Sequence, residues 1–178
     1  RHAKLVAQLE QLEANGVSER SMYRPLTSTQ PWMVGGAKLN DPTSTWINTL
    51  SDEIWITEGK KKGQVLADQN GVNVITLQGV ANYSSALPAV ENLLKKNKKI
   101  RKVIVAVDMD KMTNERVSFS NKRLIDLLIE MKTLEVKEAF WDQQYKGIDD
   151  AINNGADINV VSLQNETYVG MEQARNQM

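Results

Sequence analysis

The sequence predicts an α/β fold with a mainly parallel sheet of about four to five strands and helices on both faces. From residue 54 onward, short apolar runs alternate with helical segments, a pattern typical of right-handed βαβ crossovers. The third run, residues 103–107, is continuously apolar and mostly β-branched, as expected of a strand buried on both faces. The length of 178 residues leaves room for one ordinary domain.

Residues 1–50 are predicted to be an N-terminal extension that combines a helix with an irregular segment. Leucines recur at helical spacing within residues 3–14, and Asn15-Gly16 marks the end of that helix. Prolines and glycines interrupt residues 21–50. Within that segment, residues 32–34 are interpreted as one arm of a hairpin.

Residues 51–164 are assigned to the α/β domain, and residues 165–178 to a C-terminal tail. Apolar runs predict strands at residues 54–57, 73–77, 103–107, 136–141 and 158–163. Helical spacing predicts helices near residues 60–69, 84–97, 119–132 and 148–153.

The composition excludes several classes of site and protein. Without cysteine there is no disulfide, no thiolate zinc site and no cysteine nucleophile, and a cytoplasmic location is expected. The single histidine, His2, lies beside Arg1, which argues against a histidine-based triad or metal cluster. No apolar run approaches the ~18 residues of a membrane span, no signal peptide opens the chain, and neither a P-loop nor a G-x-G-x-x-G motif follows a strand. The chain does not begin with Met, and we expect it to be part of a longer protein.

Charge is unevenly distributed although the formal net charge is zero. Residues 58–107 carry nine positive and three negative charges, a net of +6, whereas residues 108–178 carry eight and thirteen, a net of −5. A basic segment beside an acidic one suits a surface that binds phosphate and metal, but unrelated solvated faces would give the same counts. The zero net charge argues against a generic polyanion binder.

Acidic residues follow three of the first four predicted strands. Glu58 follows the first, Asp108 and Asp110 follow the third, and Asp142 follows the fourth, while Gly79 follows the second. Ligands of open α/β sheets bind outside the carboxyl ends of the strands, and a glycine there lets a ligand approach closely. This convergence predicts a functional site at that edge of the sheet.

Asp108 and Asp110 are the predicted metal ligands. Alternate residues of a strand point to the same face, so both carboxylates can project together as the strand ends. Two carboxylates held close together repel unless a proton or a metal lies between them, and Mg²⁺ (or Mn²⁺) takes such oxygen ligands; a solvated turn is the alternative interpretation of a lone D-x-D. Glu58 is interpreted as a general base or a further metal ligand, against the alternative of an acid favoured at a helix N-terminus.

Lysines are predicted to contact phosphate groups at the same edge. Residues 60–62 are three lysines that open a helix, where cations oppose the macrodipole, so helix stability does not explain them. The basic cluster in residues 95–102 closes a helix and is interpreted as a solvated face. The residues assigned to nucleic-acid or nucleotide binding are Lys62, Gly79, Lys146, Asp149 and Asp150.

The joint order of these motifs over residues 50–156 resembles the TOPRIM domain, which bacterial-type primases, topoisomerases and some nucleases share. It is most similar to the TOPRIM-like domain of phage, plasmid and mobile-element DNA primases. The motifs that carry the resemblance are Thr57-Glu58-Gly59 with Lys62, Leu77-Gln78-Gly79-Val80, Val107-Asp108-Met109-Asp110, Asn114 and Lys146-Gly147-Ile148-Asp149-Asp150.

This resemblance implies a compact, Rossmann-like sheet flanked by helices. It also implies that Glu58 acts as acid/base or ligand and that Asp108 and Asp110 hold Mg²⁺. Replicative primases have an acidic residue where this chain has Lys62, so one metal-associated carboxylate of that branch is missing.

Three functions remain open at this point, and an enzyme is favoured. The first is Mg²⁺-dependent nucleotidyl transfer during primer synthesis in DNA replication. The second is metal-dependent nicking or cleavage of DNA, and the third is a non-catalytic module that binds nucleic acid through the basic block at residues 58–107. The expected partners are DNA and nucleotides, with a helicase domain of the parent protein as a further candidate; no membrane partner is expected.

Overall fold

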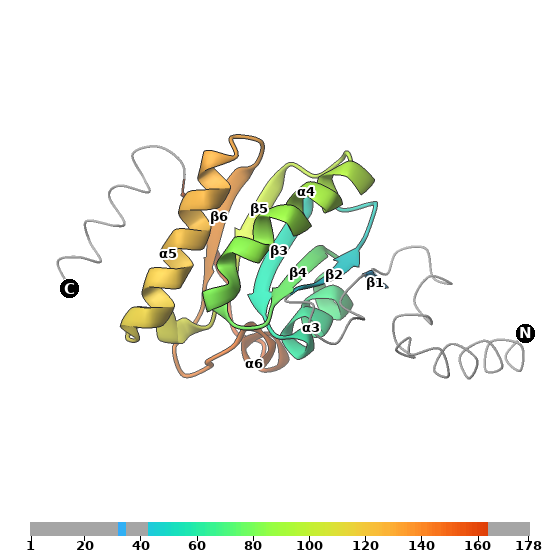
Figure 1. The fold of residues 1–178 in the computed structure, drawn as a ribbon. Helices are drawn as coiled ribbons and strands as arrows, with labels where there is room; N and C mark the ends of the chain where they lie inside the picture. Colours follow the sequence, from blue (N-terminus) through green and yellow to red (C-terminus); the bar gives the residue numbers. More distant parts are fainter. Residues whose placement is uncertain (1–31, 35–42, 164–178) are drawn as a thin grey trace, which may run out of the picture.

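The computed structural model describes residues 32–34 and 43–163, which form one mixed β-sheet with helices on both faces (Figure 1). The sheet of these residues has seven strands in the order β1-β2-β4-β3-β5-β6-β7. The strands are β1 (Trp32–Val34), β2 (Thr43–Ile47), β3 (Glu53–Glu58), β4 (Asn73–Leu77), β5 (Lys102–Val105), β6 (Glu135–Phe140) and β7 (Asn159–Ser162). The predicted α/β class is confirmed, and the sheet is wider than the four to five strands expected.

The four central strands, β4, β3, β5 and β6, run parallel to one another. Antiparallel strands extend the sheet on both sides, with β2 and β1 beyond β4 and with β7 beyond β6. The strands β3 and β5 are neighbours in the sheet. The chain passes from β3 to β4 on one side of this pair, and from β5 to β6 on the other side. Ligands of open α/β sheets bind at such a switch point, outside the carboxyl ends of the strands.

Helices cover both faces of the sheet (Figure 1). They enclose two apolar cores with it. On one face, α4 (Ala86–Lys96) and α5 (Glu115–Glu130) pack over Ile54 and Ile56, and on the other, α3 (Lys60–Asn70) and α6 (Ile148–Asn153) pack near Trp55. The cores are separate because alternate residues of a strand point to opposite faces. Two short 3₁₀ turns, η2 (Val80–Ser85) and η3 (Met109–Met112), precede α4 and α5.

Local signals explain where the elements begin and end. Gly71 adopts the left-handed conformation (φ 62°) and ends α3, as its Asn-Gly sequence predicts. The side chain of Asn114 accepts hydrogen bonds from the backbone N–H groups of Arg116 and Val117, so α5 begins four residues earlier than predicted. Strand β5 ends at Val105, two residues before the predicted end.

Strands β1 and β2 lie within the segment that the sequence assigns to an N-terminal extension. They pair with each other in antiparallel fashion, so residues 32–34 do form one arm of a hairpin. The predicted helix at residues 3–14 and the tail at residues 165–178 lie outside the described residues. Within the described ranges, no helix is long and apolar enough to cross a membrane.

Candidate active site

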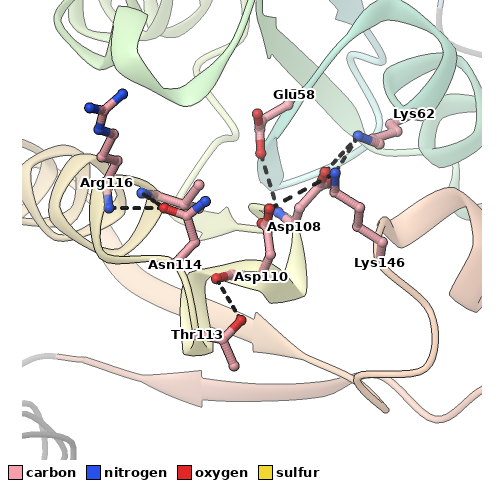
Figure 2. Close-up of polar contacts among 9 residues, drawn as sticks. Glu58, Lys62, Asp108, Asp110, Thr113, Asn114, Arg116 and Lys146 are labelled. Carbon is pink, nitrogen blue, oxygen red and sulfur yellow. Dashed lines mark hydrogen bonds and ion pairs between the residues drawn. The ribbon is translucent and has the colours of Figure 1, made fainter.

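Three predicted residues meet where β3 and β5 end at the switch point (Figure 2). Glu58 is the last residue of β3, and its Oε1 accepts a hydrogen bond from the backbone N–H of Asp108 at 3.4 Å. Lys62, in the first turn of α3, places its Nζ 2.9 Å from Oδ1 and 3.0 Å from Oδ2 of Asp108. Both oxygens of the Asp108 carboxylate therefore contact one ammonium group.

The D-x-D pair is not held on one strand face, and this part of the prediction is wrong. Because β5 ends at Val105, Asp108 is the residue that precedes the turn η3, and Asp110 lies inside it. The backbone carbonyl of Asp110 accepts hydrogen bonds from the N–H groups of Thr113 at 3.0 Å and Asn114 at 2.7 Å. The turn, rather than the pleat of the strand, keeps the two carboxylates near each other.

Burial and like charge act together on the acidic groups. Burial raises the pKa of Glu58, the charge of Asp108 raises it further, and the charge of Lys62 opposes this. Burial also raises the pKa of Asp108 despite the hydrogen bond from Lys62, and the charge of Asp110 adds to that rise. Raised carboxyl pKa values in a partly open site are typical of groups that exchange protons.

Lys62 is held in its charged form by the carboxylates around it. Burial lowers the pKa of Lys62, but the hydrogen bond and the charge of Asp108, with the charges of Glu58 and Asp149, raise it overall. An ammonium that stays protonated and touches Asp108 supplies a fixed positive charge within the site.

The motif at residues 146–150 joins the site through Gly147 and Asp149. A Cβ atom on Gly147 would lie 2.6 Å from Cε of Lys62, 2.6 Å from Oδ1 of Asp149 and 3.4 Å from Oδ1 of Asp108. Gly147 therefore leaves the space in which these three side chains meet. Asp149 is only 5% exposed.

The other two charged residues of this motif are more open. Lys146 is 70% exposed, and its Nζ lies 3.9 Å from Oδ2 of Asp110. Its backbone carbonyl accepts a hydrogen bond from the N–H of Met109 at 2.8 Å and so ties this loop to η3. Asp150 is exposed on α6, and its backbone carbonyl accepts hydrogen bonds from Asn154.

Two glycines leave the strand ends open. Gly59 (φ 79°) and Gly79 (φ 90°) both adopt conformations that favour glycine, and a Cβ on either would meet no atom within 4 Å. The N–H of Gly59 donates to the carbonyl of Leu77 at 2.8 Å, which joins the ends of β3 and β4. Gly79 thus lies at the same sheet edge as Glu58, beside open space.

Each of the two aspartates has a carboxylate oxygen of the kind that Mg²⁺ binds. Within the described residues, Oδ1 of Asp108 and Oδ1 of Asp110 are buried and lack a hydrogen-bond partner, although the former lies in the ion pair with Lys62. Mg²⁺ usually takes one or two carboxylates together with waters and substrate phosphates. In the part of the chain that the structure covers, no three His, Asp or Glu residues are arranged to hold a metal, so Glu58 does not complete a ready-made cage.

Sequence reasoning missed a buried ion pair that joins η3 to β6. Nζ of Lys111 lies 2.9 Å from Oε2 of Glu138, and the two side chains are 1% and 0% exposed. Lys111 also donates to the carbonyl of Ala139 at 2.8 Å and lies over the ring of Phe140. The available signal was Glu138 itself, a charge in the middle of the predicted strand at residues 136–141; a buried charge there needs a partner.

The basic block at residues 58–107 is divided between opposite edges of the sheet. Residues 60–62 lie at the carboxyl edge, whereas residues 95–102 precede or begin β5 and so lie at its amino end. The second group is therefore remote from Asp108, as its interpretation as a solvated face predicts.

Comparison with solved structures gives one similar chain, from a complex of bacteriophage T7. That complex contains lagging-strand DNA polymerase and the primase domains of two gp4 subunits bound to an RNA/DNA hybrid and dTTP. The sequences are 17% identical, the match covers 63% of this chain and 54% of that chain, and the TM-score is 0.40. This chain therefore matches about half the length of the T7 chain.

Curated proteins give no match. A family described as a domain of unknown function, DUF3854, matches residues 45–158, which include every predicted site residue. This match spans well over half of the chain, and the chain therefore belongs to the DUF3854 family.

Proposed function

We propose that this domain is the catalytic core of a primase-type enzyme that performs Mg²⁺-dependent nucleotidyl transfer in DNA replication. The observation that carries the proposal is the meeting of Glu58, Asp108 and Asp110 at the switch point of a parallel sheet. The order of the motifs that contain these residues also resembles that of the TOPRIM-like domain of phage and plasmid primases.

Asp108 and Asp110 would hold the Mg²⁺, since Oδ1 of each is a buried oxygen without a hydrogen-bond partner at this edge of the described sheet. When bound, the metal neutralises phosphate charge and aligns the attacking hydroxyl. The remaining steps belong to the protein's own side chains.

Glu58 is the proposed general base. Its raised pKa brings it closer to neutral pH, where a carboxylate exchanges protons most effectively. It would accept the proton of the attacking 3′-hydroxyl as the new P–O bond forms and pyrophosphate leaves. Lys146, exposed beside Asp110, would contact a phosphate of the nucleotide or the nucleic-acid backbone, and the open space beside Gly79 would admit the same ligand.

Incorporation of labelled nucleotides on a single-stranded template tests this function. Glu58→Gln removes the base and should lower turnover by ~10²-fold or more while the metal still binds. Asp108→Asn should abolish both turnover and metal binding. Asp157→Asn, the same change at an exposed position, is the matched control and should retain turnover. Incorporation that survives Glu58→Gln would contradict the proposed role of the site.

A second candidate is a non-catalytic module that binds nucleic acid, and one observation favours it. Lys62 already contacts both oxygens of Asp108, as a side-chain cation would if no metal were needed. Salt-dependent retention of single-stranded DNA by the wild type, without incorporation at any Mg²⁺ or Mn²⁺ concentration, would support this second function.

A further inference from the structure

Asp149 presents a buried oxygen that the proposed mechanism does not use. Its side chain belongs to the first turn of α6 and is 5% exposed, and its Oδ1 has no hydrogen-bond partner among the residues described. A buried carboxylate oxygen without a hydrogen bond carries a desolvation cost, which the site opposes here through the charge of Lys62. Such an atom is suited to a hydrogen bond that forms in another state of the site.

The cation nearest to this oxygen is Lys62. Oδ1 of Asp149 and Cε of Lys62 both lie 2.6 Å from the position that a Cβ on Gly147 would take. The charge of Asp149 is also among the interactions that raise the pKa of Lys62. Because Gly147 has no Cβ, no side-chain atom of this residue lies between the two groups. A side-chain rotation of Lys62 can therefore bring its ammonium to Asp149.

A divalent cation that binds Asp108 competes with Lys62 for the same two carboxylate oxygens. Nζ of Lys62 lies 2.9 Å and 3.0 Å from them. Like charges at such a separation repel strongly inside a protein. We therefore expect the ammonium to move away from Asp108 when the cation binds.

We propose that Asp149 is the second partner of Lys62, so that Lys62 pairs with Asp108 in the metal-free site and moves to Asp149 when a divalent cation binds Asp108. The inference rests on the proposed function only in requiring that cation. Asp149 is then a positioning residue that acts through Lys62, instead of a ligand for nucleic acid. The exchange keeps the ammonium of Lys62 paired with a carboxylate in both states.

Mn²⁺ affinity, measured by electron paramagnetic resonance without nucleic acid or nucleotide, tests the exchange in four proteins and a control. Asp149→Asn should weaken binding by roughly tenfold, equivalent to about 1.4 kcal/mol, because the displaced ammonium loses its partner. Lys62→Met should tighten binding by a similar factor because no competitor remains. In the Lys62→Met background, Asp149→Asn should weaken Mn²⁺ binding far less. Asp157→Asn, at an exposed position, should leave the affinity unchanged.

If Asp149→Asn weakened Mn²⁺ binding equally in the wild type and in Lys62→Met, the proposal would be overturned, because Asp149 would then act on the cation directly. Unchanged affinity in Asp149→Asn would overturn it as well. If none of the proteins bound Mn²⁺, both this proposal and the metal-dependent function would fail. If the affinities followed the expected pattern without turnover, only the enzymatic function would fail.

A measurement on the wild-type protein covers the case in which Asp149→Asn does not fold. The ¹⁵Nζ resonance of Lys62, assigned by its loss in Lys62→Met, should move to a new position on addition of Mg²⁺ and stay protected from exchange with water. Disappearance of that signal through fast exchange would mean that Lys62 moves into solvent, and it would contradict the role of Asp149.

Discussion

At the scale of single residues, Glu58 shows how the fold changes the chemistry of an ordinary side chain. It ends a strand whose preceding four residues are buried, and burial raises its pKa before any neighbouring charge is considered. A carboxyl group with a raised pKa binds its proton more tightly in the folded chain than in the unfolded chain. Its ionisation therefore reduces stability as the pH rises through the raised value, and the penalty is absent below the usual range of glutamate.

The upward shift of the Glu58 pKa predicts how the difference in stability between Glu58→Gln and the wild type depends on pH. In the presence of a chelator, the variant should melt at a higher temperature than the wild type at mildly alkaline pH, because it has no buried charge to accommodate. The difference should shrink as the pH falls and vanish once glutamate is protonated in both states. Thermal melting across that range is the measurement, with exposed Asp157→Asn as the control. A variant less stable than the wild type at alkaline pH would contradict the assigned pKa direction.

The contacts of Lys62 could not be predicted from the sequence. Its place just beyond a strand end predicts a phosphate contact, whereas the structure pairs it with Asp108, 46 residues away. Spacing along the chain places both residues at one edge but does not indicate which polar groups face each other. That depends on Gly147, whose missing Cβ lets Lys62, Asp108 and Asp149 share one space.

At the scale of elements, Asp108 and Asp110 lie at and in the turn η3, whereas the sequence predicts that they share one face at the end of a strand. The apolar residues 106 and 107 are predicted to continue the strand. Both are buried, and the N–H of Ala106 still donates to the carbonyl of Ile56 in β3 at 2.8 Å, but β5 ends at Val105. Lys111, a residue of the turn η3, pairs with Glu138 of β6, and both side chains are almost fully buried. This pair thus helps to position Asp110.

Breaking this pair from one side should be costly. Lys111→Met removes the cation that pairs with Glu138, although the amide of Asn121 still donates to Oε2 of Glu138, and should lower the free energy of unfolding by about 3–5 kcal/mol. Adding Glu138→Gln to that variant should restore part of the loss, since the buried charge is then removed. Urea denaturation of the single and double variants measures both effects, with exposed Lys95→Met as the control. A single variant as stable as the wild type would show that the pair does not support η3.

At the scale of the whole molecule, the alternation of apolar runs and helical segments was enough to predict the parallel centre of the sheet. Each of the strands β3, β4, β5 and β6 lies within two residues of its predicted range at either end. The carboxyl edge could be predicted for the same reason, because parallel strands end together. The outer strand β2 was not predicted: its alternating burial pattern is only five residues long, and its pairing partner β4 lies far away in the sequence.

The central claim is that Asp108 and Asp110 hold a divalent cation at the switch point between β3 and β5. Anomalous diffraction from crystals soaked in Mn²⁺ tests it most directly, because the signal identifies the metal and its ligands together. We predict one anomalous peak within coordination distance of Asp108 and Asp110, with Lys62 withdrawn from Asp108, and no such peak in Asp108→Asn crystals. Soaked wild-type crystals in which Lys62 still contacts both oxygens of Asp108 and no peak lies at this edge would contradict the claim.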